Sequence, residues 1–182
     1  MAAARTPSRN VFDNDTVCAL LRRLNNKAFL VLRHLQRVTQ QKAEQAGQAW
    51  DRLWEAALPS IRYYNTQLQD AMAAQLAAEV PDVDAGLIAA YKQYCALHLG
   101  TTSDGRINMM DVDPPPLRDF YHAFLVRLSE NRVVINRDMF QPAAHAAFDT
   151  ACANAFLDAL RDVLLHRVTV TAVLTRQSSA RD

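Results

Sequence analysis

The side chains best suited to metal binding or catalysis are five histidines and three cysteines in a chain of 182 residues. The histidines fall on several different predicted helices, at His34, His98, His122, His145 and His166. Cys18, Cys95 and Cys152 are far apart and odd in number, and each lies in an apolar helical stretch, as reduced core cysteines do. The sequence therefore predicts neither a zinc site nor a disulfide framework.

Other patterns that signal catalysis or cofactor binding are also missing. Only four glycines occur in the chain, which leaves little room for a phosphate-binding loop. Asp111 and Asp113 lie beside three prolines, and two carboxylates supply too few oxygen ligands for calcium. No serine or cysteine stands in the local sequence of a known nucleophile. We therefore expect no enzyme activity and no cofactor.

Positive charge is concentrated at the N-terminal end, although the formal net charge of the chain is only +1. Residues 1–45 hold eight Lys and Arg side chains against three Asp and Glu. Because neutralised phosphates dominate affinity for nucleic acid, seven of these residues are candidate contacts: Arg5, Arg9, Arg22, Arg23, Lys27, Arg33 and Arg37. A solvated helix face, or pairing with the more acidic residues 46–100, explains the same charges.

A short heptad pattern marks the first predicted helix. Apolar residues from Val17 to Val38 recur at alternating steps of four and three, a seam that packs against a partner helix or against helices of the same chain. Trp50 and Trp54 share a helix face and suit a protein interface or a core. The candidate interface residues are Val17, Leu21, Leu24, Val31, Leu35, Trp50, Trp54, Val168 and Val170.

The N-terminal half is predicted to be helical after a flexible arm, residues 1–14. The helical region, residues 15–100, starts with a long basic helix from Asp15 or Thr16 that continues, or hinges near Gly47, before Pro59. An antiparallel hairpin of two helices follows, over residues 60–79 and 84–99. Residues 101–116 are a Pro-rich linker that ends in Pro114-Pro115-Pro116.

The C-terminal region, residues 117–182, is predicted to combine two helices with a terminal strand. The helices span residues 117–130 and about 142–163, with Pro142 in a first turn. The segment Val133–Ile135 is predicted to be extended. The β-branched residues between Val168 and Val173 predict a strand, which pairs with that segment or adds to the sheet of a neighbouring molecule. The expected fold is mainly α, a five-helix bundle-like domain with a small C-terminal strand pair.

Two amphipathic stretches carry a resemblance to a known group of proteins. Residues Leu117 to Leu125, with sequence LRDFYHAFL, and Asp158 to Leu164, with sequence DALRDVL, resemble small helical virion proteins, minor structural components of large double-stranded DNA viruses. The resemblance falls within residues 117–182. It implies a structural component of a particle, ordered by its neighbours, and assigns no functional residue.

The sequence thus favours a non-catalytic structural or assembly protein that binds copies of itself or other proteins. The resemblance implies further that this protein is a minor component of a virion. The alternative is a nucleic-acid binding or packaging protein that uses the Arg-rich first helix. With no signal peptide and no apolar run of membrane-spanning length, we expect no membrane partner. The expected location is intracellular, in the cytoplasm or nucleus, or within a virion.

Overall fold

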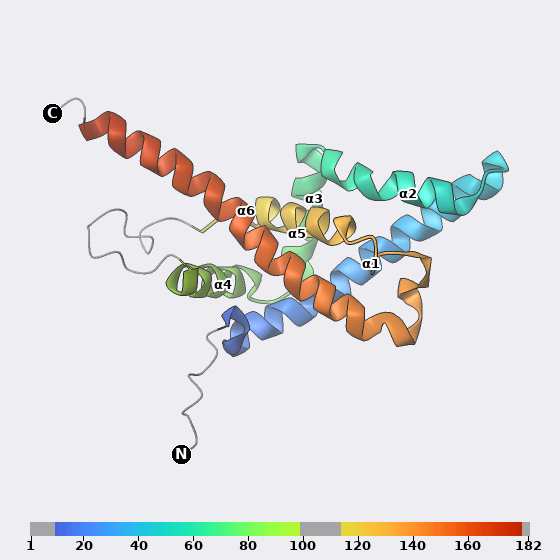
Figure 1. Ribbon diagram of the computed structural model, residues 1–182, viewed down its shortest axis with the longest axis horizontal. Helices are drawn as coiled ribbons and strands as arrows, with labels where there is room; N and C mark the ends of the chain where they lie inside the picture. Colours follow the sequence, from blue (N-terminus) through green and yellow to red (C-terminus); the bar gives the residue numbers. More distant parts are fainter. Residues whose placement is uncertain (1–9, 99–113, 180–182) are drawn as a thin grey trace, which may run out of the picture.

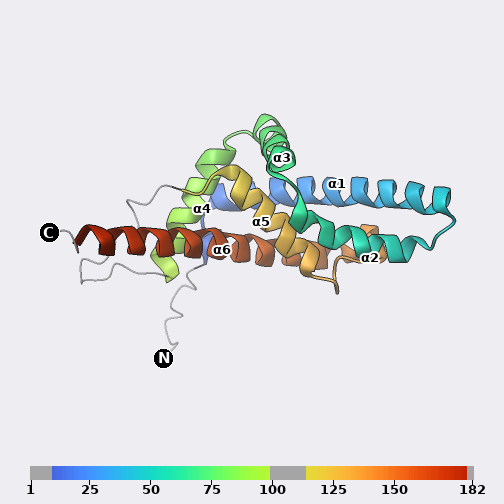
Figure 2. The ribbon, with the colours of Figure 1, turned by 90° about the horizontal axis from the view of Figure 1, so that it is seen from above.

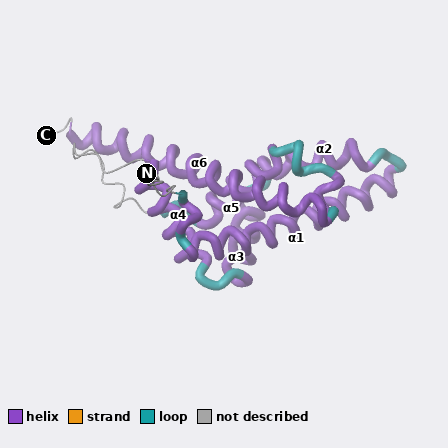
Figure 3. Tube along the Cα trace, turned by 60° about the horizontal axis from the view of Figure 1, so that its bottom comes forward, coloured by secondary structure: helices purple, strands orange, loops and turns teal. Residues whose placement is uncertain are grey.

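The computed structural model describes residues 10–98 and 114–179 and, among these, the side chains of residues 10–97 and 114–164. Within these ranges the chain forms six α-helices (Figure 1): α1 Asp15–Ala46, α2 Trp50–Ser60, α3 Thr66–Glu79, α4 Val83–His98, α5 Leu117–Glu130 and α6 His145–Ser179. A short 3-10 turn precedes α1 at Val11–Asp13, and others join later helices at Ile61–Tyr63, Arg137–Phe140 and Pro142–Ala144. Figure 3 shows helix and loop throughout the described chain, which confirms the mainly α prediction.

Of the two alternatives for the first helical stretch, a continuous helix or a hinge near Gly47, the structure shows the second, with α1 and α2 as separate helices, so the expected count of five becomes six. The α1 helix begins after Asn14, whose side chain accepts hydrogen bonds from the backbone N–H groups of Thr16 and Val17. It ends at Gly47, which has a φ of 62°, a left-handed conformation that glycine adopts at little cost. The chain reverses there, and α2 runs back along the second half of α1 (Figure 2).

The predicted C-terminal strand pair is wrong. Residues 131–136 form turns, in which the Ile135 N–H donates to the carbonyl of Asn131 at 2.8 Å. Val168 and Val170 lie within α6, which continues as a helix to Ser179. Each β-branched residue lowers helix propensity by only about 0.5 kcal/mol, and extending an existing helix avoids the cost of nucleating a new element.

One hydrophobic core is shared by all six helices, with α5 and α6 packed side by side within it. Phe120 of α5 and Phe156 of α6 are fully buried and meet edge to face, with ring centroids 5.1 Å apart. Leu24 and Leu32 of α1 are buried in the same cluster. The core thus draws on both the N-terminal and the C-terminal helical regions.

The α3 helix lies at the edge of the bundle (Figure 2) and packs mainly against α5. An ion pair between Lys27 and Glu79 joins its C-terminal end to α1. Its N-terminal end follows the turn Ile61–Tyr63, which is fixed to α5: His122 Nε2 lies 2.9 Å from the Ile61 carbonyl oxygen. Because α5 holds this end away from α1, the two helices leave a groove between them.

Candidate functional site: a groove between α1 and α3

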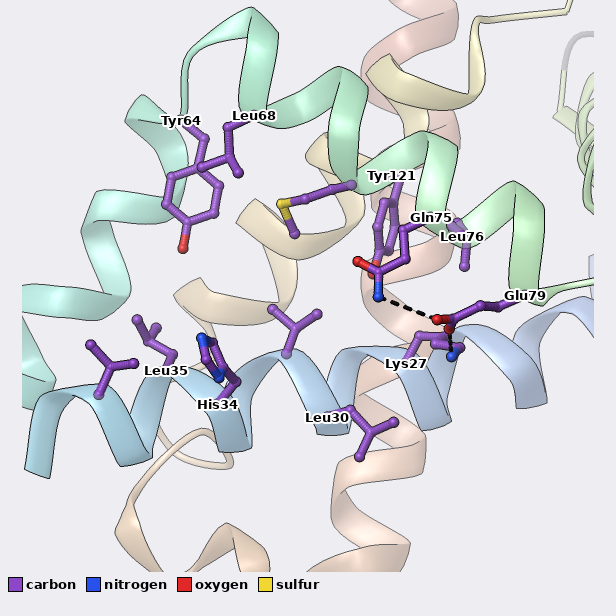
Figure 4. A pocket seen from close by; sticks show the side chains of 13 residues that line it. Lys27, Leu30, His34, Leu35, Tyr64, Leu68, Gln75, Leu76, Glu79 and Tyr121 are labelled. Atoms are coloured by element: carbon purple, nitrogen blue, oxygen red, sulfur yellow. Dashed lines mark hydrogen bonds and ion pairs between the residues drawn. The ribbon is translucent and has the colours of Figure 1, made fainter.

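The groove between α1 and α3 has a volume of about 650 Å³ and is bordered largely by apolar side chains (Figure 4). The α1 wall contains Leu30, Val31, Leu35 and Val38, with His34 among them. The α3 wall contains Leu68, Met72 and Leu76. Two long helices therefore present apolar rows to the same open space.

One end of the groove is closed and its floor is aromatic. At the closed end Lys27 pairs with Glu79, and Gln75 donates a hydrogen bond to the same carboxylate at 3.2 Å. Tyr121 of α5 and Tyr64 lie toward the floor and the opposite end. Burial raises the pKa of Tyr121 to about 12 and also raises the pKa of Tyr64. Both phenols are therefore neutral near pH 7 and add no negative charge.

Two leucines at the mouth of the groove are unusually exposed. Leu30 is 57% exposed on α1 and Leu68 is 42% exposed on α3. Exposed apolar side chains that gather around a concave surface, rather than scatter singly, mark sites of protein or ligand contact. The groove is therefore the candidate functional site.

The predicted heptad seam divides between the core and this groove. Val17 and Leu24 are fully buried in the core, and Leu21 packs against its edge. Val31 and Leu35 line the groove instead. Only the second half of the seam thus borders an open surface.

The other interface candidates contribute less. Trp54 is 3% exposed and belongs to the core, where the ring of half-buried Trp50 stacks on it with centroids 5.8 Å apart. The tryptophan pair therefore covers the core between α1 and α2. Val168 and Val170 lie in α6, and their side chains are outside the described part.

The predicted nucleic-acid contacts on α1 lie along one side of the helix but differ in their partners. Arg22, Arg23 and Arg37 are exposed on α1, whereas Lys27 pairs with Glu79 at the groove. Arg33 lies over the ring of Phe140, 5.9 Å from its centroid. By helical spacing Arg22, Arg23, Arg33 and Arg37 fall within an arc of about 100°, and Lys27 lies beside it. Arg5 and Arg9 lie outside the described residues.

Sequence reasoning missed the exposed residues of the groove. Leu30 falls outside the heptad positions, and Leu68 and Met72 belong to a helix whose spacing alone predicts a core-facing row. The available signal was composition. The α3 helix has no charged residue between Asp70 and Glu79, and its exposed positions there are alanines and Gln75, so charge does not mark one face as facing solvent.

No protein-family model, curated protein or solved structure matches this chain. The resemblance to virion proteins therefore stays a prediction. Over the described residues, no helix has both the length and the apolar character to cross a membrane. Within the same part of the chain, no three His, Cys, Asp or Glu side chains gather as ligands for a metal ion.

Proposed function

We propose that this chain is a non-catalytic structural or assembly protein that binds a helix of another protein in the α1/α3 groove. The observation that carries the proposal is the exposure of Leu30 and Leu68 at the mouth of an apolar, concave surface. A helix laid in such a groove buries its own apolar stripe against both walls. Full burial of an exposed leucine contributes about 1.5–3 kcal/mol, so covering the exposed parts of Leu30 and Leu68 would contribute roughly half of that for each, which favours binding.

The polar groups at the groove support binding rather than chemistry. Lys27 and Glu79 neutralise each other, and Gln75 is also bonded to Glu79. His34 has no hydrogen-bond partner within the described part of the chain, so no carboxylate there orients it as a general base.

The test is a display library of helical peptides that share an apolar stripe on a neutral Ala/Gln background, selected on the full-length protein. Peptides with leucines at helical spacing should be enriched. The double variant Leu30→Glu/Leu68→Glu should weaken their binding by at least about tenfold, because each carboxylate would lose water on binding. Val133→Glu/Ile88→Glu is the control matched in charge, since Val133 is 87% and Ile88 37% exposed and neither lines the groove. Equal loss in both variants, or no enriched helix, would reject the proposal.

Binding to nucleic acid is the second candidate. Arg22, Arg23 and Arg37 are exposed and form no ion pair among the described residues, which favours it. It requires retention on duplex DNA or RNA at low salt that falls steeply as salt rises. Replacing the three arginines by glutamate should then abolish retention, and unchanged retention would reject this function.

A further inference from the structure

From the charges that border the groove, we infer that its occupant is an amphipathic helix with acidic side chains flanking its apolar stripe. This inference rests on the proposed function, because it specifies the partner of the same groove. Its basis is an imbalance: beside the α1 wall stand two arginines, Arg23 and Arg37, that no acidic residue of the α3 wall pairs with.

The α1 wall is basic along its outer edge. Arg23, Lys27, Leu30, His34 and Arg37 follow one another at intervals of four, three, four and three residues and so form one row, the α1 rim. Lys27 is neutralised by Glu79. Arg23 and Arg37, at the two ends of the rim, are exposed and form no ion pair within the described chain. The rim therefore has an unbalanced positive charge on each side of exposed Leu30.

The α3 wall supplies no matching negative charge. Its two acidic residues are Asp70 and Glu79, and both are already paired: Asp70 with Arg118 at 3.2 Å and Glu79 with Lys27. The other α3 side chains that line the groove are Leu68, Met72, Gln75 and Leu76, and none of them is charged.

The dimensions of the groove suit a helix of about three turns. From Lys27 to Val38 the α1 wall covers roughly 17 Å at 1.5 Å per residue. Figure 4 shows the closed end at Lys27 and Glu79, and Tyr64 and Leu68 at the other end. A helix of about 14 residues, one turn longer than the groove, spans roughly 21 Å and would place apolar side chains on the groove walls and its flanking residues beside Arg37 and, past the closed end, beside Arg23.

Nucleic acid fits this surface less well than an acidic helix. Leu30, 57% exposed, lies in the middle of the basic rim, where a phosphate backbone would cover it without an apolar partner. Arg33, one turn before Arg37, already lies over the ring of Phe140. A partner that offers both carboxylates and apolar side chains satisfies the whole rim.

The test compares three synthetic helices of about 14 residues, long enough for the three turns of the groove. All have the same leucine stripe, and their flanking positions are all Glu, all Lys or all Gln. Fluorescence anisotropy with the full-length protein at physiological ionic strength should show the Glu peptide binding at least about tenfold more tightly than the Lys peptide. The difference should shrink in 1 M salt, where the Debye length is about 3 Å.

Charge-reversal variants distinguish the effect of the rim arginines from the effect of the protein's net charge. Arg23→Glu/Arg37→Glu should reverse the order of the Glu and Lys peptides. Arg22→Glu/Arg52→Glu, which changes net charge equally at exposed arginines off the rim, should keep it. Equal binding of all three peptides, still lost in Leu30→Glu/Leu68→Glu, would overturn the acidic partner while the proposed function stands.

Three further outcomes would overturn the inference. If none of the three helices binds the groove, the proposed function fails as well. If duplex DNA binds more tightly than the Glu peptide and competes with it, the rim is a nucleic-acid contact. A dimer in light scattering that Leu30→Glu dissociates would place a second copy of this chain in the groove instead.

Discussion

Gly86 of α4 lies so close to Leu20 of α1 that a Cβ added at Gly86 would be 3.1 Å from both the Cβ and the Cδ2 of Leu20. Leu20 is 4% exposed and cannot move out toward solvent. The missing side chain at position 86 therefore sets how closely α4 approaches the helix that forms one wall of the groove.

Gly86→Val should lower the free energy of unfolding by about 1–3 kcal/mol, because overpacking forces the helices apart. Ala85→Val, an exposed position on the same helix, should cost only a few tenths, the difference in helix propensity. Urea denaturation followed by circular dichroism measures both. Equal losses would show that the close approach of α1 and α4 does not limit stability.

The pair Arg127 and Asp162 should contribute measurably to the packing of α5 on α6. Arg127 Nε and Nη2 donate to the two carboxylate oxygens at 2.6 and 2.7 Å, a bidentate pair that is about one third exposed. A double-mutant cycle with Arg127→Ala and Asp162→Ala should give a coupling energy of about 1 kcal/mol. The cycle for Arg161 and Asp158, a more exposed pair at 3.4 Å, should give about 0.3 kcal/mol. A larger coupling in the second pair would contradict this reading.

Stability should fall at alkaline pH because the thiol of Cys152 is buried. Burial raises its pKa from 9.0 to about 12 in the folded protein. The unfolded chain therefore releases this proton first, so the stabilisation is complete below pH 9 and is lost as pH rises toward 12. The loss reaches up to about 1.4 kcal/mol per pH unit. Cys152→Ala should be less stable at pH 8 but should lose stability less steeply between pH 9 and 11, and parallel curves for the two proteins would contradict the cause.

The heptad pattern predicted an apolar seam on the first helix. It did not predict that the first half of the seam would pack in the core and the second half would line a groove. A straight α-helix drifts by about 20° per heptad relative to a strict seven-residue repeat. From Val17 through Leu24 to Val31 and Val38 the seam therefore turns gradually away from the core. The first two side chains are buried, whereas the last two line the groove. The position of α3 decides where along α1 the seam faces the groove instead of the core. That position depends on contacts between residues distant in sequence, such as His122 with Ile61.

Local signals explain which helix boundaries could be predicted. The α5 helix spans Leu117–Glu130, as expected, because three prolines precede it and its apolar spacing is regular. The left-handed conformation of Gly47 fits the hinge expected there. The end of α6 was missed because the alternation of valine and threonine after Val168 favours a strand, and nothing local shows that a preceding helix continues through it.

The most direct measurement is methyl NMR of the full-length protein, labelled at Leu, Val and Met, during titration with a helical peptide that carries the leucine stripe. The methyl signals of Leu30, Val31, Leu68 and Met72, all on the groove walls, should shift together and saturate at one binding constant. Val133, exposed on another part of the surface, should not shift. Shifts that cluster away from the groove, or none at peptide excess, would contradict the conclusion that the α1/α3 groove binds a partner helix.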